Sequence, residues 1–305
     1  MAGVLIGFGI IAFVILVGYV AGRFGLGGPS AGFVLHRIAF FIASPALLFT
    51  VLVKADLRDV FSANLLVAGV ASVFTALVFV AASRLFFARS VAETTVGTLG
   101  AGYVNANNIG LPVAVYVLGN AALVAPVLLL QVIVFAPVAL AVLDIASRGR
   151  SSLRVMLLQP ARNPIILASL LAVLIDLTGW RIPNAVLQPL DILGGAAVPM
   201  VLLAFGISLR GARPLRAERE RMPIIAASLG KAVLMPVVAY VFATLLGMHG
   251  HALFSVVALA ALPTAQNVFN YASRYRQGEL LARDTVLVTT IAALPVLLVI
   301  SALLA

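Results

Sequence analysis

The chain has 305 residues and a net charge of +10, with 63% hydrophobic and only 10% charged residues, and its mean hydropathy is +1.17. A soluble domain carries about 25% charged residues, so this composition excludes a soluble domain and indicates a polytopic membrane protein. The chain contains no cysteine, which excludes disulfides, thiolate catalysis and cysteine-ligated metals.

The hydropathy pattern predicts ten transmembrane helices joined by short connections, since each crossing needs about 20 apolar residues. The first has no Lys or Arg before it and no convincing cleavage site, so we interpret it as a retained helix rather than a signal peptide. The predicted spans are 3–22, 32–53, 61–83, 92–118, 121–143, 160–178, 185–209, 223–246, 250–274 and 281–303.

The basic residues predict the orientation of these spans. With the N-terminus placed outside, all but four of the 20 Lys and Arg residues lie in or beside the cytoplasmic loops. We therefore expect both termini on the periplasmic face of a bacterial inner membrane. The positive charge is a topology signal, and no nucleic-acid partner is expected. The four exceptions are Lys54, Arg58, Arg181 and Lys231.

Spans four and nine each contain a proline and a cluster of amides, at Pro112 and Pro263, which are 151 positions apart. Such residues free backbone groups that cost several kcal/mol if they stay unpaired in hydrocarbon. Paired breaks of this kind predict the binding site of a transporter. The candidate substrate-binding residues are Asn105, Asn108, Gly110, Pro112, Pro263, Gln266, Asn267 and Asn270.

The spacing of the prolines also indicates an internal repeat. Pro45 and Pro199 are 154 positions apart, and Pro137 and Pro295 are 158 positions apart. Residues 1–150 and 155–305 are therefore predicted to be two five-helix copies. Because each copy has an odd number of spans, the copies would enter the membrane in opposite directions, as in an inverted repeat.

The amides allow two roles. Asn105 and Asn108 share one face if the helix is intact, and their donors and acceptors suit a carboxylate or an alkali cation. They could also cap the backbone at the break, and the two roles are compatible. A half-helix that starts at the break would direct its positive end at the cavity, which favours an anionic group.

Lys231 lies nine residues into span eight. A lysine near mid-bilayer costs about 2.5–3.5 kcal/mol, which indicates a functional or ion-pairing role rather than a snorkelling side chain. No carboxylate is predicted at mid-membrane, and no metal site or cofactor is expected. The three histidines lie near predicted helix ends without metal-ligand spacing, so we interpret them as interfacial. They are His36, His249 and His251.

Several of these motifs, in this order, resemble the auxin efflux carrier family along nearly the whole chain. In span four the resemblance rests on Asn105, Gly110 and Pro112. Elsewhere it rests on Ala261-Leu262-Pro263, on Lys231 five residues before Pro236, on Asn163-Pro164, and on Gly194-Gly195-Ala196-Ala197-Val198.

The resemblance implies a fold of ten helices in two inverted five-helix repeats, with broken helices four and nine crossing at mid-membrane. It also implies a scaffold of spans 1, 2, 6 and 7, a moving unit of spans 3, 4, 5, 8, 9 and 10, and a homodimer. Two positions depart from the plant members, which have a proline at Val268 and an aspartate at Asn64. Asn64 and Lys231 are therefore candidates for coupling transport to an ion or for supporting the site, although this chain lacks the aspartate that the plant members have at position 64.

We interpret the chain as a secondary active transporter of small organic anions, either auxin-like or malonate-like carboxylates, that works by alternating access of the elevator type. Protons are favoured over sodium as the coupling ion, although amides and free carbonyls could ligate sodium. A passive channel or exchanger is the alternative. An intramembrane enzyme is less favoured, because the sequence shows no mid-membrane Asp pair, Ser/His pair or metal cluster.

Overall fold

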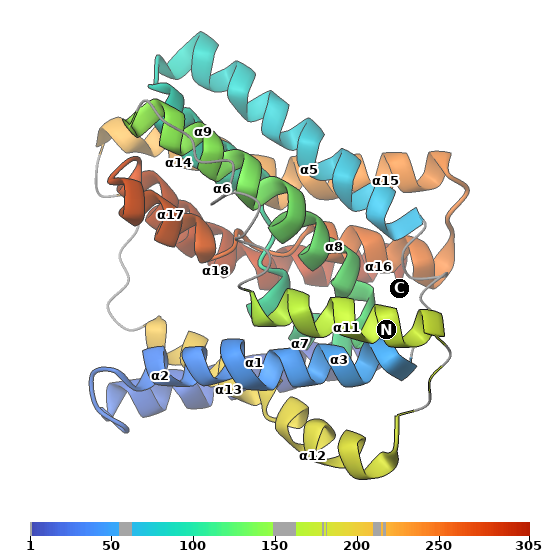
Figure 1. Ribbon diagram of the computed structural model, residues 1–305. Helices are drawn as coiled ribbons and strands as arrows, with labels where there is room; N and C mark the ends of the chain where they lie inside the picture. Colours follow the sequence, from blue (N-terminus) through green and yellow to red (C-terminus); the bar gives the residue numbers. More distant parts are fainter. Residues whose placement is uncertain are drawn as a thin grey trace.

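The computed structural model describes residues 2–54, 63–148, 163–178, 180, 182–209, 215 and 218–305. This part of the chain consists of helices joined by turns and short irregular segments, with one isolated β-bridge (Figure 1). Six of its helical stretches are long and apolar enough to cross a membrane, which confirms an all-helical multi-pass membrane protein. These stretches are Ala31–Lys54, Ala63–Phe87, Ala121–Ser147, Asn184–Ser208, Glu218–Leu245 and Glu279–Leu304.

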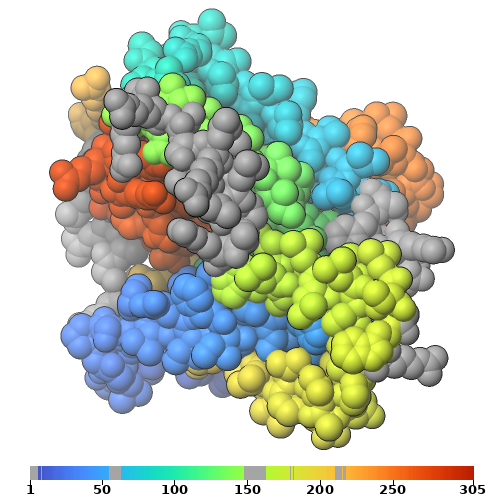
Figure 2. All heavy atoms as spheres, viewed as in Figure 1, coloured from blue at the N-terminus to red at the C-terminus, as the bar shows by residue number. Residues whose placement is uncertain are grey.

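Helices from the beginning and the middle of the chain form one layer, which lies at the bottom of Figure 1 and appears blue and yellow in Figure 2. In this first layer α1 and α2 pack on α13, and α3 packs on α11 and α12. Gly18 of α1 and Gly206 of α13 allow the close approach, because a Cβ at either position would collide with the backbone of the other helix. The members are α1 (Ala2–Arg23), α2 (Ala31–Ile38), α3 (Ser44–Lys54), α11 (Pro164–Thr178), α12 (Asn184–Gly195) and α13 (Ala197–Ser208).

The remaining helices form a second layer, in which α5 packs on α6 and α15, α14 and α16 pack on α18, and α6 packs on α9. Its contacts with the first layer include those of α7 with α1 and α13. The members are α5 (Ala63–Ala82), α6 (Val91–Gly102), α7 (Leu111–Tyr116), α8 (Ala125–Leu130), α9 (Ala136–Arg148), α14 (Glu218–Leu229), α15 (Met235–Leu245), α16 (Gly250–Ala260), α17 (Asn267–Tyr275) and α18 (Glu279–Leu304).

Helix ends depart from the predicted spans where polar residues extend a helix beyond its apolar part. The third predicted span continues as a π-helical turn to Phe87, and the eighth begins at Glu218 instead of 223. Pro223 is the sixth residue of that helix and cannot donate to the Arg219 carbonyl, which accepts instead from Arg89 Nη2 at 2.9 Å. The starts of predicted spans three and six, and the junction of the two predicted repeats, lie outside the described residues.

π-helical turns interrupt several of these helices. A π turn inserts one residue, so it changes which side chains face a neighbouring helix, and such turns are frequent at functional sites. Three of them carry a buried amide or lysine side chain of the second layer. These are Ala106–Gly110 with Asn108, Gln131–Phe135 with Gln131, and Gly230–Leu234 with Lys231.

Candidate functional site

The two helix breaks predicted from sequence lie against each other. The chain leaves the helical conformation at 103–105 and at 263–265, and Val104 and Thr264 form an antiparallel β-bridge there. The Asn105 amide donates to the Pro263 carbonyl at 2.8 Å, and the Ala265 amide donates to the Tyr103 carbonyl at 3.0 Å. Backbone groups that neither helix can satisfy are therefore paired between the two breaks.

Thr264 anchors this crossing to the second layer. Its side chain is fully buried, its hydroxyl donates to the Gly100 carbonyl at 2.6 Å, and its amide donates to the Thr289 hydroxyl at 3.1 Å. The break between α16 and α17 is thereby held to both α6 and α18. Such a fixed crossing can hold nearby side chains in a defined geometry.

Three predicted site residues shape the backbone at the breaks. Pro112 lies in the first turn of α7, directly after the π turn Ala106–Gly110, and its ring removes one backbone donor from this helical stretch. Pro263 supplies the carbonyl that pairs with Asn105. Gly110 is packed so closely that a Cβ would lie 3.0 Å from the side chains of Leu262 and Val124. None of the three lines the cavity described next, and their contact with a substrate stays a prediction.

Asn105 caps the helix that begins at the first break. Its Oδ1 accepts from the Asn108 amide at 3.1 Å, and the Asn107 side-chain amide donates to Asn108 Oδ1 at 2.9 Å. Asn105 and Asn108 therefore do not share the face of an intact helix, because Asn105 is the cap that precedes the π turn containing Asn108. Capping still leaves the Nδ2 of Asn105 for another acceptor.

A cavity of about 40 Å³, which we call the inner cavity, lies beside the breaks. Four predicted site residues line it together: Asn105, Asn108, Gln266 and Asn267. Asn270 lies one turn further along α17 and is exposed, outside this lining. Because Asn267 is the first residue of α17, the positive end of that helix lies at the cavity.

Sequence reasoning missed several residues of the inner cavity, of which Gln131 is the most informative. Gln131 is 2% exposed, and its Nε2 has no hydrogen-bond partner among the residues that the structure describes. A buried donor without a partner is costly, and a ligand carboxylate would satisfy it. The signal in the sequence was a single amide inside the apolar fifth span. Asn107 and Asn163 also line the cavity, and Asn163 caps α11 by accepting from the Ile165 amide at 3.0 Å.

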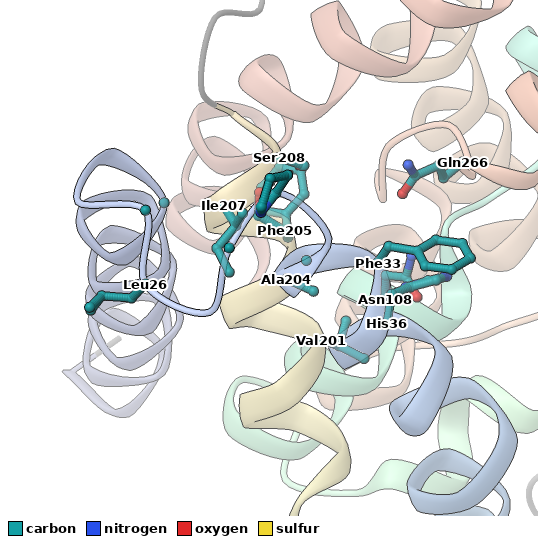
Figure 3. A pocket seen from close by; sticks show the side chains of 15 residues that line it. Leu26, Phe33, His36, Asn108, Val201, Ala204, Phe205, Ile207, Ser208 and Gln266 are labelled. Carbon is teal, nitrogen blue, oxygen red and sulfur yellow. Dashed lines mark hydrogen bonds between the residues drawn. The ribbon is translucent and has the colours of Figure 1, made fainter.

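A second cavity of about 580 Å³, the outer cavity, lies between the Gly22–Pro29 turn, α2, α13 and Gln266. It shares three lining residues with the inner cavity, namely His36, Asn108 and Gln266. Figure 3 shows His36, Phe33 and Asn108 close together, with Leu26 at the far end of the cavity. His36 is half-buried in the second turn of the helical stretch Ala31–Lys54, near its N-terminal end as the sequence predicts, and its interpretation as an interfacial residue stays a prediction.

Lys231 lies behind the second break. Its side chain is fully buried, its Nζ donates to the Ala260 carbonyl at 2.6 Å, and Met235 Sδ is 3.1 Å from it. Lys231 therefore binds the carboxyl end of α16, where the helix dipole favours a cation. Among the described residues no carboxylate forms a salt bridge with Lys231.

Asn64 lies near the same groups, because it lines a small cavity of about 10 Å³ together with Met235 and Ala260. That volume is close to the space one water molecule needs. The coupling role of Asn64 and Lys231 stays a prediction. Within the part of the chain that the structure describes, no cluster of His, Asp and Glu could hold a metal ion.

The similarity of this chain to known proteins supports a function as a membrane transporter. Residues 8–154 and 144–301 match the family described as "Membrane transport protein". A protein of Rhizobium meliloti named "Putative malonate transporter" is 29% identical over 84% of this chain and 82% of its own. An uncharacterized transporter of Methanocaldococcus jannaschii is 22% identical over 92% of each chain.

Proposed function

We propose that this chain, which belongs to the membrane transport protein family, is a secondary active transporter of small organic anions. The family match confirms the predicted resemblance to the auxin efflux carriers and the choice of a transporter over an enzyme. The observation that carries the proposal is the inner cavity, where amides from two paired helix breaks meet Gln131. Amide donors and the positive end of α17 suit a carboxylate.

We propose a small dicarboxylate such as malonate as the substrate. The inner cavity of about 40 Å³ is small, and the unpartnered Nε2 of Gln131 is a donor for a carboxylate oxygen. The relative from Rhizobium meliloti, with its malonate name, supports this choice. An auxin-like monocarboxylate, which is bulkier and has a single carboxylate, fits the cavity less well.

We propose alternating access of the elevator type, with ten crossings in two inverted five-helix repeats. The first layer would be the scaffold and the second layer the moving unit, since the inner cavity has walls from both layers. The outer cavity lies beside the turn after Arg23, which the basic residues assign to the cytoplasm. That position supports an inward-open conformation for this structure. The resemblance further suggests a homodimer, which light scattering of the purified protein would test.

The coupling ion is proposed to be a proton rather than sodium, with Lys231 as the candidate carrier. Lys231 contacts the carbonyl end of α16 without a counter-charge among the described residues. It could therefore release its proton without leaving a buried carboxylate unpaired. A sodium site built from amides and free carbonyls is the competing arrangement.

The experiment is a transport assay with purified protein in liposomes, using radiolabelled malonate, other dicarboxylates and monocarboxylates, each under an imposed proton or sodium gradient. We expect malonate accumulation above equilibrium that requires the pH gradient. Flux that never exceeds equilibrium would favour a passive channel, and no carboxylate flux at all would refute the proposal. Accumulation that requires sodium would overturn only the choice of ion.

A further inference from the structure

His36 is the feature of the two cavities that the proposed function does not yet use. It projects from α2 of the first layer and lines both the inner and the outer cavity. Asn108 and Gln266, which belong to the second layer, are the other two residues common to both linings. These three side chains therefore lie where the outer and the inner cavity adjoin.

The surroundings hold the imidazole ring in place without occupying its polar atoms. Its ring stacks on that of Phe40, one turn along the helix, with centroids 6.5 Å apart. No hydrogen bond or ion pair of the His36 side chain is present among the described residues. The ring nitrogens are thus free of partners in the described protein and can meet a ligand in either cavity.

His36 is also the one side chain lining either cavity, among the described residues, that can take up a proton and pair with an anion as a cation. The neighbouring Arg37 is directed elsewhere, with its guanidinium 5.6 Å from the ring centroids of Phe33 and Phe41. Lys231 is bound to the Ala260 carbonyl and lines neither cavity. No Asp or Glu of the described part of the chain lines either cavity.

A dicarboxylate brings two negative charges, and both lose water when the anion enters the site. The amides and the end of α17 supply neutral donors and partial charge, and a full positive charge would make a stronger, charge-assisted bond. We propose that His36 binds one carboxylate of the transported anion from the first layer, and that this contact makes the carrier select dicarboxylates over monocarboxylates. The inference rests on the proposed function and deepens it.

The test compares malonate with malonamate, its half-amide, which has nearly the same shape but one carboxylate. Equilibrium binding of both is measured for the purified wild-type protein and for His36→Gln, His36→Arg and His249→Gln. The last variant is the matched control, because His249 is exposed and lines neither cavity. Gln keeps a polar side chain without charge, and Arg restores the charge.

We expect the wild type and His249→Gln to bind malonate at least about tenfold more tightly than malonamate, as a bond to a charged group predicts. His36→Gln should lower that ratio by about tenfold, and His36→Arg should keep it. An unchanged ratio in His36→Gln would overturn the assignment. Equal binding of the two ligands by the wild type would also overturn it, even if the Gln variant does not fold.

The two proposals fail in distinguishable ways. If the wild type moves malonate in liposomes but the ratio does not depend on His36, only the assignment of His36 is wrong. If the wild type neither binds nor moves any carboxylate, the proposed function is wrong and the His36 inference is overturned with it.

Discussion

Substitutions of Asn105 can separate helix capping from anion binding, because this residue caps a helix and also lines the inner cavity. Its Oδ1 accepts from the Asn108 amide at 3.1 Å, and the residue lines the inner cavity. Asn105→Asp keeps an oxygen in the capping position but adds a negative charge where the substrate anion is proposed to bind. Asn120 is the matched control, since its Oδ1 caps the Ala122 amide at 2.9 Å outside both cavities.

The expected magnitudes follow from these contacts. Aspartate caps a helix as well as asparagine does, and its charge is favoured at a helix N-terminus, so Asn105→Asp should remain stable. Asn105→Ala should lose about 1 kcal/mol of stability with the cap. Two like charges about 8 Å apart repel by about 2 kcal/mol at an effective dielectric constant of about 20. That energy corresponds to roughly thirtyfold weaker binding of an anion to Asn105→Asp.

The assay is thermal unfolding in detergent together with malonate binding for Asn105→Asp, Asn105→Ala, Asn120→Asp and Asn120→Ala. We expect both alanine variants to unfold at lower temperature and both aspartate variants to match the wild type. Only the two Asn105 variants should bind malonate more weakly. Wild-type affinity in Asn105→Asp would remove this residue from the anion site, and equal destabilisation by Asp and Ala would refute its role as a cap.

Three other predictions concern coupling, the cavity and topology. Lys231→Gln should still exchange malonate but lose accumulation driven by a pH gradient. The control Lys54→Gln, which removes an exposed ion pair with Asp191, should keep that accumulation. Accumulation driven by a pH gradient in Lys231→Gln would exclude this lysine as the proton carrier. Gln131→Leu should unfold at or above the wild-type temperature, because it removes a buried donor without a partner among the described residues. The same variant should bind malonate at least about tenfold more weakly. Unchanged malonate affinity would mean that Gln131 does not face the anion. A reporter that is active only in the cytoplasm, fused after Ala305, should give no signal, and a strong signal would mean that the number of crossings is wrong.

The candidate site could be predicted in part because helix breaks are local events. A proline removes a backbone donor wherever the chain folds, so Pro112 and Pro263 marked the breaks without any knowledge of their neighbours. The amides next to these prolines could likewise be assigned to the two helix breaks. Asn270 shows the limit of this reasoning, because it lies in the same motif but is exposed one turn away from the cavity.

Gln131 and His36 could not be assigned to the site from sequence, because their position depends on packing. Gln131 begins a π turn, whose extra residue changes the face that the helix presents to its neighbours. His36 belongs to the first layer and reaches the cavity only because α2 packs on α13 beside the breaks. Hydropathy alone describes neither effect.

The sequence by itself determined the class of the protein, the orientation expected for its loops and the two positions where helices are interrupted. Composition, charge and proline act within a short stretch of chain, so these properties can be obtained without coordinates. Only the tertiary structure decided that the two breaks pair with each other and which polar side chains gather beside them. The bond from Thr264 to the Gly100 carbonyl joins residues 164 positions apart, and such contacts arise because buried backbone groups must find partners wherever the folded chain supplies them.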